Sequence, residues 1–304
     1  MNLLITGAWP DAKANIPELE AMGHSVAFLQ QERDDLPCDP AWVEGVICNG
    51  LFLHHPIEQF PNLRFIQLTS AGFDRVDMDY VRSHHIEIHN ARGVYSIPMA
   101  EFAVAGVLQL YKQMRYFAEN QKARRWEKHR GLLELDGKTV TVVGCGSVGT
   151  ECAKRFKAFG CRVLGIDLFP GNDEVYEKIL PLDRLEDTLP VTDILILTVP
   201  LTEETMRLID RCRLSLLPCT AVVVNISRGA VLDGTALREM LTDGRLAGAV
   251  LDVFEIEPLP ADSPLWDAPN LILTPHNSFV GENCNRRLYE RMIRDLQEER
   301  HTIS

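Results

Sequence analysis

The chain has 304 residues, of which 46% are hydrophobic and 24% are charged, and its formal net charge is −12. These values are ordinary for a globular protein of about two domains, and they exclude a disordered chain, a collagen and a coiled coil. The acidic balance argues against nucleic acid as the main partner, because phosphate binding requires a basic surface.

No apolar stretch approaches the ~18 residues that a membrane span requires. The first residues, MNLLITGAWPD, predict a strand and a turn, because they lack the basic start and long apolar segment of a signal peptide. The eight cysteines form no C-x-x-C motif and no cysteine–histidine cluster with zinc spacing. We therefore expect no membrane partner, no metal and no disulfide framework, but small buried thiols that stay reduced in the cytoplasm.

The first third of the chain contains short apolar runs separated by segments with Pro and Gly. This pattern predicts strands that alternate with helices or loops. The expected strands are 2–6, 25–29, 45–48 and 64–68, with 86–88 as a further candidate.

Around residue 97 the pattern changes to that of a helix. Pro98 is tolerated in a first helical turn, Glu101 suits the positive end of a helix, and a largely apolar segment follows to about residue 114. The next stretch, KARRWEKHRG at 122–131, is basic and aromatic. It suits a solvated surface loop, and the alternative is contact with a partner subunit or with the rim of an active site.

From residue 139 onward the apolar runs are uninterrupted, which is typical of parallel strands covered on both faces. Helical stretches separate most of them, and a final helix is expected over about 281–300. The sequence therefore predicts an α/β protein with two doubly wound parallel-sheet domains. The expected strands of the second domain are 139–143, 162–166, 193–199, 221–226, 246–251 and 271–274.

A glycine-rich loop follows the first of these strands and opens a helix. It has the G-x-G-x-x-G spacing of a dinucleotide-binding loop, in the strand–loop–helix context that such a loop requires. The free N–H groups of the helix would hold phosphates. The loop consists of Gly144, Cys145, Gly146, Ser147, Val148 and Gly149.

Asp167 ends the next strand, where an acidic side chain accepts hydrogen bonds from the adenosine ribose and repels a 2′-phosphate. The residues that follow it, Leu168 to Gly171, include no Lys or Arg. The sequence therefore favours NAD over NADP as the cofactor.

Three later segments place polar side chains just after buried strands, where open α/β sheets bind their ligands. They carry Arg228, then Asp252 with Glu255 and Glu257, and finally His276. Each alone would suit a surface or loop residue. Together they supply a fixed guanidinium, a titratable imidazole, and a carboxylate that favours its charged form.

This set and its order resemble the D-isomer-specific 2-hydroxyacid dehydrogenase family, which includes glyoxylate and hydroxypyruvate reductases, D-lactate dehydrogenases, phosphoglycerate dehydrogenases and formate dehydrogenases. The resemblance covers nearly the whole chain. The motifs that carry it are TSAGFDRVD (69–77), IPMAEFAV (97–104), ELDGKTVTVVGCGSVG (134–149), LTVPLTEET (197–205), NISRG (225–229), LDVFEIEPLP (251–260) and TPHNS (274–278).

The resemblance implies a Rossmann NAD-binding domain at residues 97–276, inserted into a flavodoxin-like substrate-binding domain at residues 1–96 and 277–304. It implies an active site in the cleft between them and a homodimer. The expected reaction is hydride transfer between NAD and a 2-oxo or D-2-hydroxy acid of the glyoxylate or hydroxypyruvate type.

The resemblance also implies a role for each matching residue. Arg228 would anchor the substrate, His276 would be the general acid/base, and Glu257 would be its partner. The amides of Ala71 and Gly72 would hold the substrate carboxylate, and Asp252 would orient the nicotinamide carboxamide. Other residues would lie along the cofactor, namely Thr198, Val199, Pro200 and Ile226.

Two alternatives stay open at this point. A 3-phosphoglycerate dehydrogenase without a regulatory domain would need a phosphate site near Arg75, His54 or His55, although these histidines would also suit an exposed loop. An NAD-sensing corepressor built on the same scaffold is disfavoured by the intact Arg–Glu–His set and by the lack of a basic or disordered extension. Formate dehydrogenases pair the histidine with Gln, so Glu257 argues against that branch.

Overall fold

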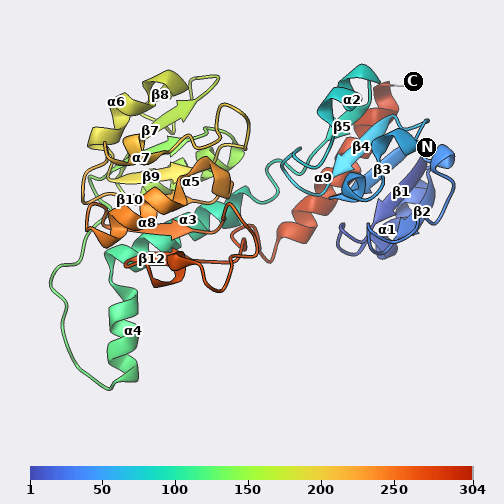
Figure 1. The fold of residues 1–304 in the computed structure, drawn as a ribbon. Coiled ribbons are helices and arrows are strands. Elements are labelled where there is room, and N and C mark those ends of the chain that lie inside the picture. Colours follow the sequence, from blue (N-terminus) through green and yellow to red (C-terminus); the bar gives the residue numbers. More distant parts are fainter. Residues whose placement is uncertain (303–304) are drawn as a thin grey trace. The chain divides into compact units, whose positions relative to one another are not determined.

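A computed structural model describes residues 1–302 of the chain. It divides the chain into two compact units, Met1–Val94 together with the segment from Gly281 onward, and Tyr95–Val280. Each unit is an α/β domain with a parallel sheet (Figure 1), which confirms the predicted fold class. The predicted boundaries, 96/97 and 276/277, lie a few residues from the observed crossings. Tyr95 and Phe279 are in ring contact within the second unit, so the segments next to both crossings belong to it.

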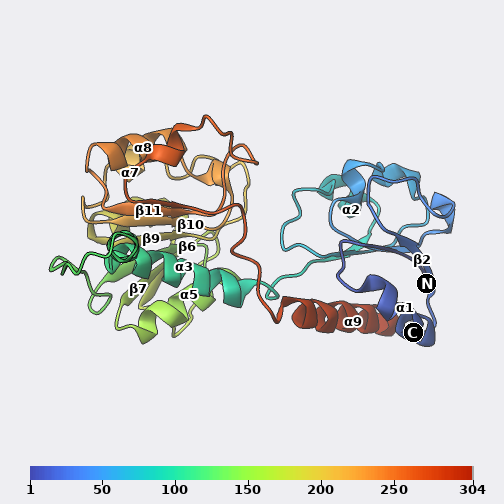
Figure 2. The ribbon, with the colours of Figure 1, turned by 90° about the horizontal axis from the view of Figure 1, so that it is seen from below.

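The first unit contains five parallel strands in the order β2-β1-β3-β4-β5, which is the flavodoxin-like order. Helices α1 (Ala12–Ala21) and α9 (Cys284–Thr302) lie together on one face of the sheet (Figure 2), and α2 (Met78–Ser83) belongs to the same unit. On α9, Leu288, Met292 and Leu296 recur every four residues and are buried, as the amphipathic period of a helix requires. The strands are β1 (Asn2–Thr6), β2 (Ser25–Leu29), β3 (Gly45–Cys48), β4 (Phe65–Leu68) and β5 (Glu87–His89).

The second unit contains seven parallel strands in the order β12-β11-β10-β9-β6-β7-β8. This is the Rossmann order extended by one strand. The strands are β6 (Thr139–Val143), β7 (Arg162–Asp167), β8 (Lys178–Pro181), β9 (Ile194–Leu197), β10 (Val222–Asn225), β11 (Gly248–Leu251) and β12 (Leu271–Leu273). The sequence did not predict β8, because its KILP segment is short and lies at the half-buried edge of the sheet.

Helices cover both faces of this sheet (Figure 2), as the apolar strands predict. One core cluster joins a face of the sheet to α3 (Ser96–Tyr111) and α5 (Ser147–Ala158). The other cluster joins the opposite face to α6 (Leu185–Thr188), α7 (Arg211–Leu214) and α8 (Gly234–Thr242). Gly106 lets α3 approach the sheet closely, because a Cβ there would lie 2.7 Å from a methyl group of Val250.

The helix predicted to run from Pro98 to about residue 114 is interrupted in the structure. It ends at Tyr111, Gln113 adopts a left-handed conformation with φ 51°, and α4 (Met114–Lys122) then begins. Helix α4 and the segment after it project from the body of the second unit (Figure 1). Within residues 1–302, no helix is both long and apolar enough to cross a membrane.

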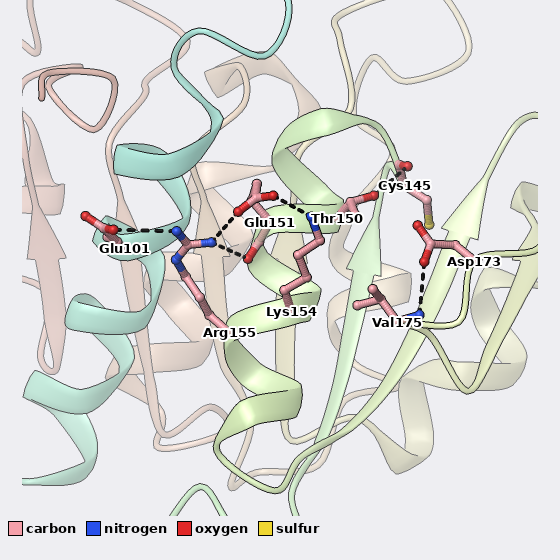
Figure 3. A network of polar contacts seen from close by, with 8 residues as sticks. All are labelled: Glu101, Cys145, Thr150, Glu151, Lys154, Arg155, Asp173 and Val175. Carbon is pink, nitrogen blue, oxygen red and sulfur yellow. Dashed lines mark hydrogen bonds and ion pairs between the residues drawn. The ribbon is translucent and has the colours of Figure 1, made fainter. Parts of the chain in front are cut away.

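A network of ion pairs fixes α5 against α3 (Figure 3). Arg155 donates to the Glu151 carboxylate at 2.6 Å and approaches Glu101 of α3 at 3.5 Å, and Lys154 donates to Glu151 at 2.7 Å. Partial burial opposes ionisation of Glu151, but hydrogen bonds and charge from Lys154 and Arg155 outweigh it and hold its pKa below the usual value. The network therefore helps to hold in place the helix that begins at the glycine-rich loop.

Candidate functional site

The strand register of the second sheet places the predicted site residues along one edge. Val143 is aligned with Ile166 on one side and with Leu197 on the other, and Asn225, Leu251 and Leu273 continue the same row. The residue after each member of this row stands at the carboxyl edge of the sheet, where ligands bind in open α/β folds. These residues are Asp167, Gly144, Thr198, Ile226, Asp252 and Thr274.

The glycine-rich loop has the conformation that its sequence predicts. Gly144 lies at φ +98°, and a Cβ on Gly149 would stand 1.9 Å from the Gly144 carbonyl oxygen, so α5 packs directly against the loop. A Cβ on Gly146 would meet nothing within 4 Å, which leaves open space over the loop. Ser147 and Val148 form the first turn of α5, whose amides have no acceptor within the helix. An oriented set of N–H donors beside open space fits a dinucleotide pyrophosphate.

The carboxylate of Asp167 is held in place by backbone amides. One oxygen accepts a hydrogen bond from the Cys145 amide at 2.7 Å, and the other accepts one from the Phe169 amide at 2.9 Å. The Cys145 thiol beneath the loop stays neutral, because burial raises its pKa to about 12. The two amides therefore fix the Asp167 carboxylate at the end of β7, beside the glycine-rich loop.

Thr198 ties the end of β9 to the glycine-rich loop. Its hydroxyl donates to the Gly144 carbonyl at 2.7 Å and approaches the Val143 carbonyl at 3.1 Å. Val199 and Ile226 are buried, whereas Pro200 is exposed. The loops after β9 and β10 therefore lie at the same carboxyl edge of the sheet as the glycine-rich loop.

His276 and Glu257 come together although they are far apart in the sequence. The His276 Nδ1 lies 2.8 Å from one oxygen of Glu257, and the other oxygen accepts a hydrogen bond from the Phe254 amide at 2.9 Å. Since a carboxylate accepts, Nδ1 is the donor, and Nε2 is the ring atom left to exchange a proton with a ligand. Both side chains are about one-third exposed, at 39% for His276 and 34% for Glu257.

Asp252 organises the loop that carries His276. It is fully buried, and its carboxylate accepts hydrogen bonds from the Thr274 hydroxyl at 2.6 Å and from the amides of Asn277 and Ser278 at 2.8 Å each. Its carbonyl accepts from the His276 amide at 2.7 Å. The sequence did not predict this structural part for Asp252, whose contact with nicotinamide stays a prediction.

Arg228 lies on a turn that is packed against the Glu257 loop. Its Nη1 donates to the Ser227 carbonyl at 2.9 Å, and buried Asn225 shapes the turn by donating to the Arg228 carbonyl at 3.0 Å. A Cβ on Gly229 would stand 1.9 Å from the Phe254 carbonyl carbon. The loop after β10 therefore contacts the residue whose amide holds Glu257. Sequence reasoning missed Asn225, although its place at the end of a buried strand is the signal that could have revealed it.

Ala71 and Gly72 belong to the first unit, in the loop after β4. The Ala71 carbonyl accepts from the Asn90 side chain at 2.6 Å, and the Gly72 carbonyl accepts from the Ser70 hydroxyl at 3.2 Å. The amides of Ala71 and Gly72 take no part in these two bonds, and their binding of a substrate carboxylate stays a prediction. Across the part of the chain that the structure describes, no three His, Cys, Asp or Glu side chains group as metal ligands would.

All eight cysteines are free thiols. Cys48, Cys152, Cys161 and Cys284 are buried as expected, but Cys212 and Cys219 are exposed. The expectation of buried thiols is therefore wrong for these two. Their segment, RCRLSLLPCT, forms the short helix α7 and the turn after it, which contribute only some of their side chains to the core.

Comparison with known proteins identifies the second unit. A model of the "D-isomer specific 2-hydroxyacid dehydrogenase, NAD binding domain" matches residues 104–278. A glyoxylate reductase of Korarchaeum cryptofilum is 35% identical over 79% of this chain and 74% of its own length. A D-3-phosphoglycerate dehydrogenase of Archaeoglobus fulgidus is 34% identical over 72% of this chain, but over only 42% of its own length.

Solved structures match along nearly the whole chain. The crystal structure of D-lactate dehydrogenase from Aquifex aeolicus, complexed with NAD and lactic acid, has 25% sequence identity and a TM-score of 0.82. The match covers 97% of this chain and 94% of that one. The likeness therefore extends beyond the nucleotide-binding unit to the unit that contains Ala71 and Gly72.

Proposed function

The chain belongs to the D-isomer specific 2-hydroxyacid dehydrogenase family and is an NAD-dependent D-2-hydroxyacid dehydrogenase, and we propose that it acts on a 2-oxo acid of the glyoxylate or hydroxypyruvate type. The observation that carries the proposal is the His276–Glu257 pair at 2.8 Å, beside the turn that holds Arg228. A titratable imidazole and a fixed guanidinium are the groups that reduction of a 2-oxo acid requires.

The glycine-rich loop, Asp167 and Thr198 fit the cofactor, because the loop offers oriented donors beside open space and Asp167 offers a fixed acceptor. When bound, NADH supplies the hydride that reduces the carbonyl carbon. In the proposed mechanism Arg228 and the amides of Ala71 and Gly72 bind the substrate carboxylate and orient the carbonyl. His276 donates the proton at Nε2 to the carbonyl oxygen, and Glu257 holds the imidazolium in place through Nδ1.

A panel of 2-oxo acids tests the proposed substrate class. We expect NADH oxidation with glyoxylate or hydroxypyruvate, and weaker turnover with pyruvate or a branched 2-oxo acid. Lack of turnover with every member of the panel, while NADH still binds, would contradict the proposal. The 3-phosphoglycerate dehydrogenase alternative needs a phosphate site near Arg75, and a Cβ on Gly50 would lie 3.8 Å from the Arg75 Cδ but 3.5 Å from a carboxylate oxygen of Glu32, so the loop after β3 lies beside a charge of each sign. Faster turnover of phosphohydroxypyruvate than of hydroxypyruvate would favour it.

Replacing Asp167 is expected to weaken the use of NADH. The variant Asp167→Ala loses a charged acceptor for the ribose hydroxyls. A hydrogen bond to a charged group contributes about 1.5–3 kcal/mol, so kcat/KM for NADH should fall about 10- to 150-fold. NADPH should lose less, because the repulsion of its 2′-phosphate disappears. The variant Asp167→Asn, which keeps an oxygen for the Cys145 amide, separates the loss of charge from a distorted loop. If the ratio of kcat/KM for NADH to kcat/KM for NADPH stays unchanged in both variants, the result would contradict this role of Asp167.

We also propose a cytoplasmic homodimer. The free thiols fit a reducing compartment. The arm formed by α4 and the following segment carries exposed apolar side chains, namely Trp126 at 98% exposure, Met114, Leu132 and Leu133. Because projecting apolar side chains of this kind are typical of protein interfaces, we assign the dimer contact to this arm.

The variant Trp126→Ser is therefore expected to shift the protein from dimer toward monomer at micromolar concentration, measured by light scattering after size exclusion. Trp266→Ser is the control, since Trp266 is also exposed but lies on a different loop. A monomeric parent protein, or a dimer that Trp126→Ser leaves intact, would show that the arm is not the interface.

A further inference from the structure

The ring of His276 contacts an aromatic residue as well as Glu257. The ring centroids of His276 and Phe279 lie 6.0 Å apart at an interplanar angle of 84°. Phe279 in turn contacts Tyr95, with centroids 5.8 Å apart at 85°. Both contacts are edge-to-face, the arrangement that aromatic quadrupoles favour. Three rings therefore form a chain that ends at the proposed acid/base.

One hydrogen bond does not fix the plane of an imidazole. The bond from Nδ1 to Glu257 defines one direction, and the ring can still tilt about that direction. The side chain is 39% exposed, so solvent leaves room for such a tilt. The perpendicular ring of Phe279 meets His276 at a second point, and two separated contacts restrain the ring plane and with it the direction of Nε2.

Tyr95 holds Phe279 in turn. Phe279 is 41% exposed and would be free to change rotamer without a neighbour. Tyr95 stands directly before α3, and α3 is anchored in the core through Ala100, Ala103 and Val107. The buried helix therefore sets the position of the Tyr95 ring. The Tyr95 ring restrains Phe279, and Phe279 in turn contacts His276.

We propose that Phe279 and Tyr95 are positioning residues, which set the ring plane of His276 so that Nε2 faces the substrate carbonyl. The inference rests on the proposed role of His276 as the acid/base. It assigns no substrate contact to either aromatic ring. Proton transfer depends on geometry, and a misplaced group can lower the rate by about 10²-fold, so the contribution falls on kcat rather than on substrate binding.

The test replaces the ring while keeping apolar bulk. For Phe279→Leu we expect kcat to fall about 10- to 100-fold with an unchanged KM for the 2-oxo acid. Tyr95→Leu should act in the same direction, and the double variant should lose less than the product of the two single losses, because both act through one ring. Phe279→Tyr, which keeps the ring, should recover most of kcat. The matched control is Phe159→Leu, since Phe159 is 45% exposed at the end of α5 and takes no part in the site.

A second measurement needs no substrate. The ring nitrogen signals of His276, recorded by NMR without a 2-oxo acid, should shift or broaden in Phe279→Leu and stay as in the parent protein in Phe159→Leu. A rise in KM with unchanged kcat would overturn the proposal and make Phe279 a substrate contact, and unchanged His276 signals would also overturn it. If instead the proposed acid/base role of His276 is wrong, His276→Ala will keep its activity. That result distinguishes failure of the proposed function from failure of the positioning role.

Discussion

Replacing His276 by alanine is expected to lower kcat for 2-oxo acid reduction by about 10²- to 10⁴-fold, the range that a positioned general acid contributes. The structure supports this magnitude, because Nδ1 is engaged by Glu257 at 2.8 Å and only Nε2 can deliver the proton. NADH binding should survive, since the proposed cofactor contacts are at the glycine-rich loop and Asp167. Steady-state NADH oxidation measures the loss, and a fluorescence titration with NADH shows that the cofactor site is intact.

The variant Glu257→Gln is the informative companion to this experiment. Gln keeps an oxygen that can accept from Nδ1 but removes the negative charge that stabilises the imidazolium. Without the neighbouring charge, kcat for 2-oxo acid reduction should fall, but by less than in His276→Ala. Steady-state NADH oxidation by the two variants measures both losses. Full activity in His276→Ala, or an unchanged kcat in Glu257→Gln, would contradict the acid/base assignment.

The contacts around His276 show why the sequence alone predicts only part of the candidate site. The apolar runs that end at Val143, Leu197 and Asn225 predict parallel strands, and their alignment at one edge follows from the fold class. The contacts of Asp252 with Thr274, Asn277 and Ser278 do not follow, because nothing in a linear pattern indicates where a buried carboxylate finds its donors. The Phe279 ring contact is hidden in the same way.

The point where α3 ends and the presence of β8 could not be predicted from the sequence either. The sequence predicts one helix from Pro98 to about residue 114, yet α3 ends at Tyr111, and α4 begins at Met114 after the left-handed Gln113. Helix propensities differ by less than the energy of packing, so tertiary contacts decide where a helix ends. The same reasoning explains β8, whose short edge segment gains its strand conformation from pairing with β7.

Replacing Arg228 is expected to cause the second large loss of activity. Truncating one partner of a hydrogen-bonded charge pair costs about 2–5 kcal/mol, which corresponds to a loss of about 30- to 5000-fold in kcat/KM for Arg228→Ala. Arg228→Lys should recover only part of this loss, because an ammonium is a point charge and cannot reproduce the planar fork that matches a carboxylate and its adjacent carbonyl. Steady-state kinetics with a saturating NADH concentration measure both losses.

The division of that loss between KM and kcat tells what Arg228 does. If Arg228 only binds the carboxylate, KM should rise and kcat should be kept, because ground state and transition state lose the same interaction. If it also orients the carbonyl toward Nε2 of His276, kcat should fall as well, and the double variant with His276→Ala should lose less than the sum of the two free energies. The buried Asn225 and the packed Gly229 hold the turn together with the bond from Arg228 Nη1 to the Ser227 carbonyl, so Arg228→Ala should fold and lose only a little thermal stability. Retained kcat/KM in the folded Arg228→Ala variant would remove the substrate anchor from the mechanism and shift carboxylate binding to the amides of Ala71 and Gly72.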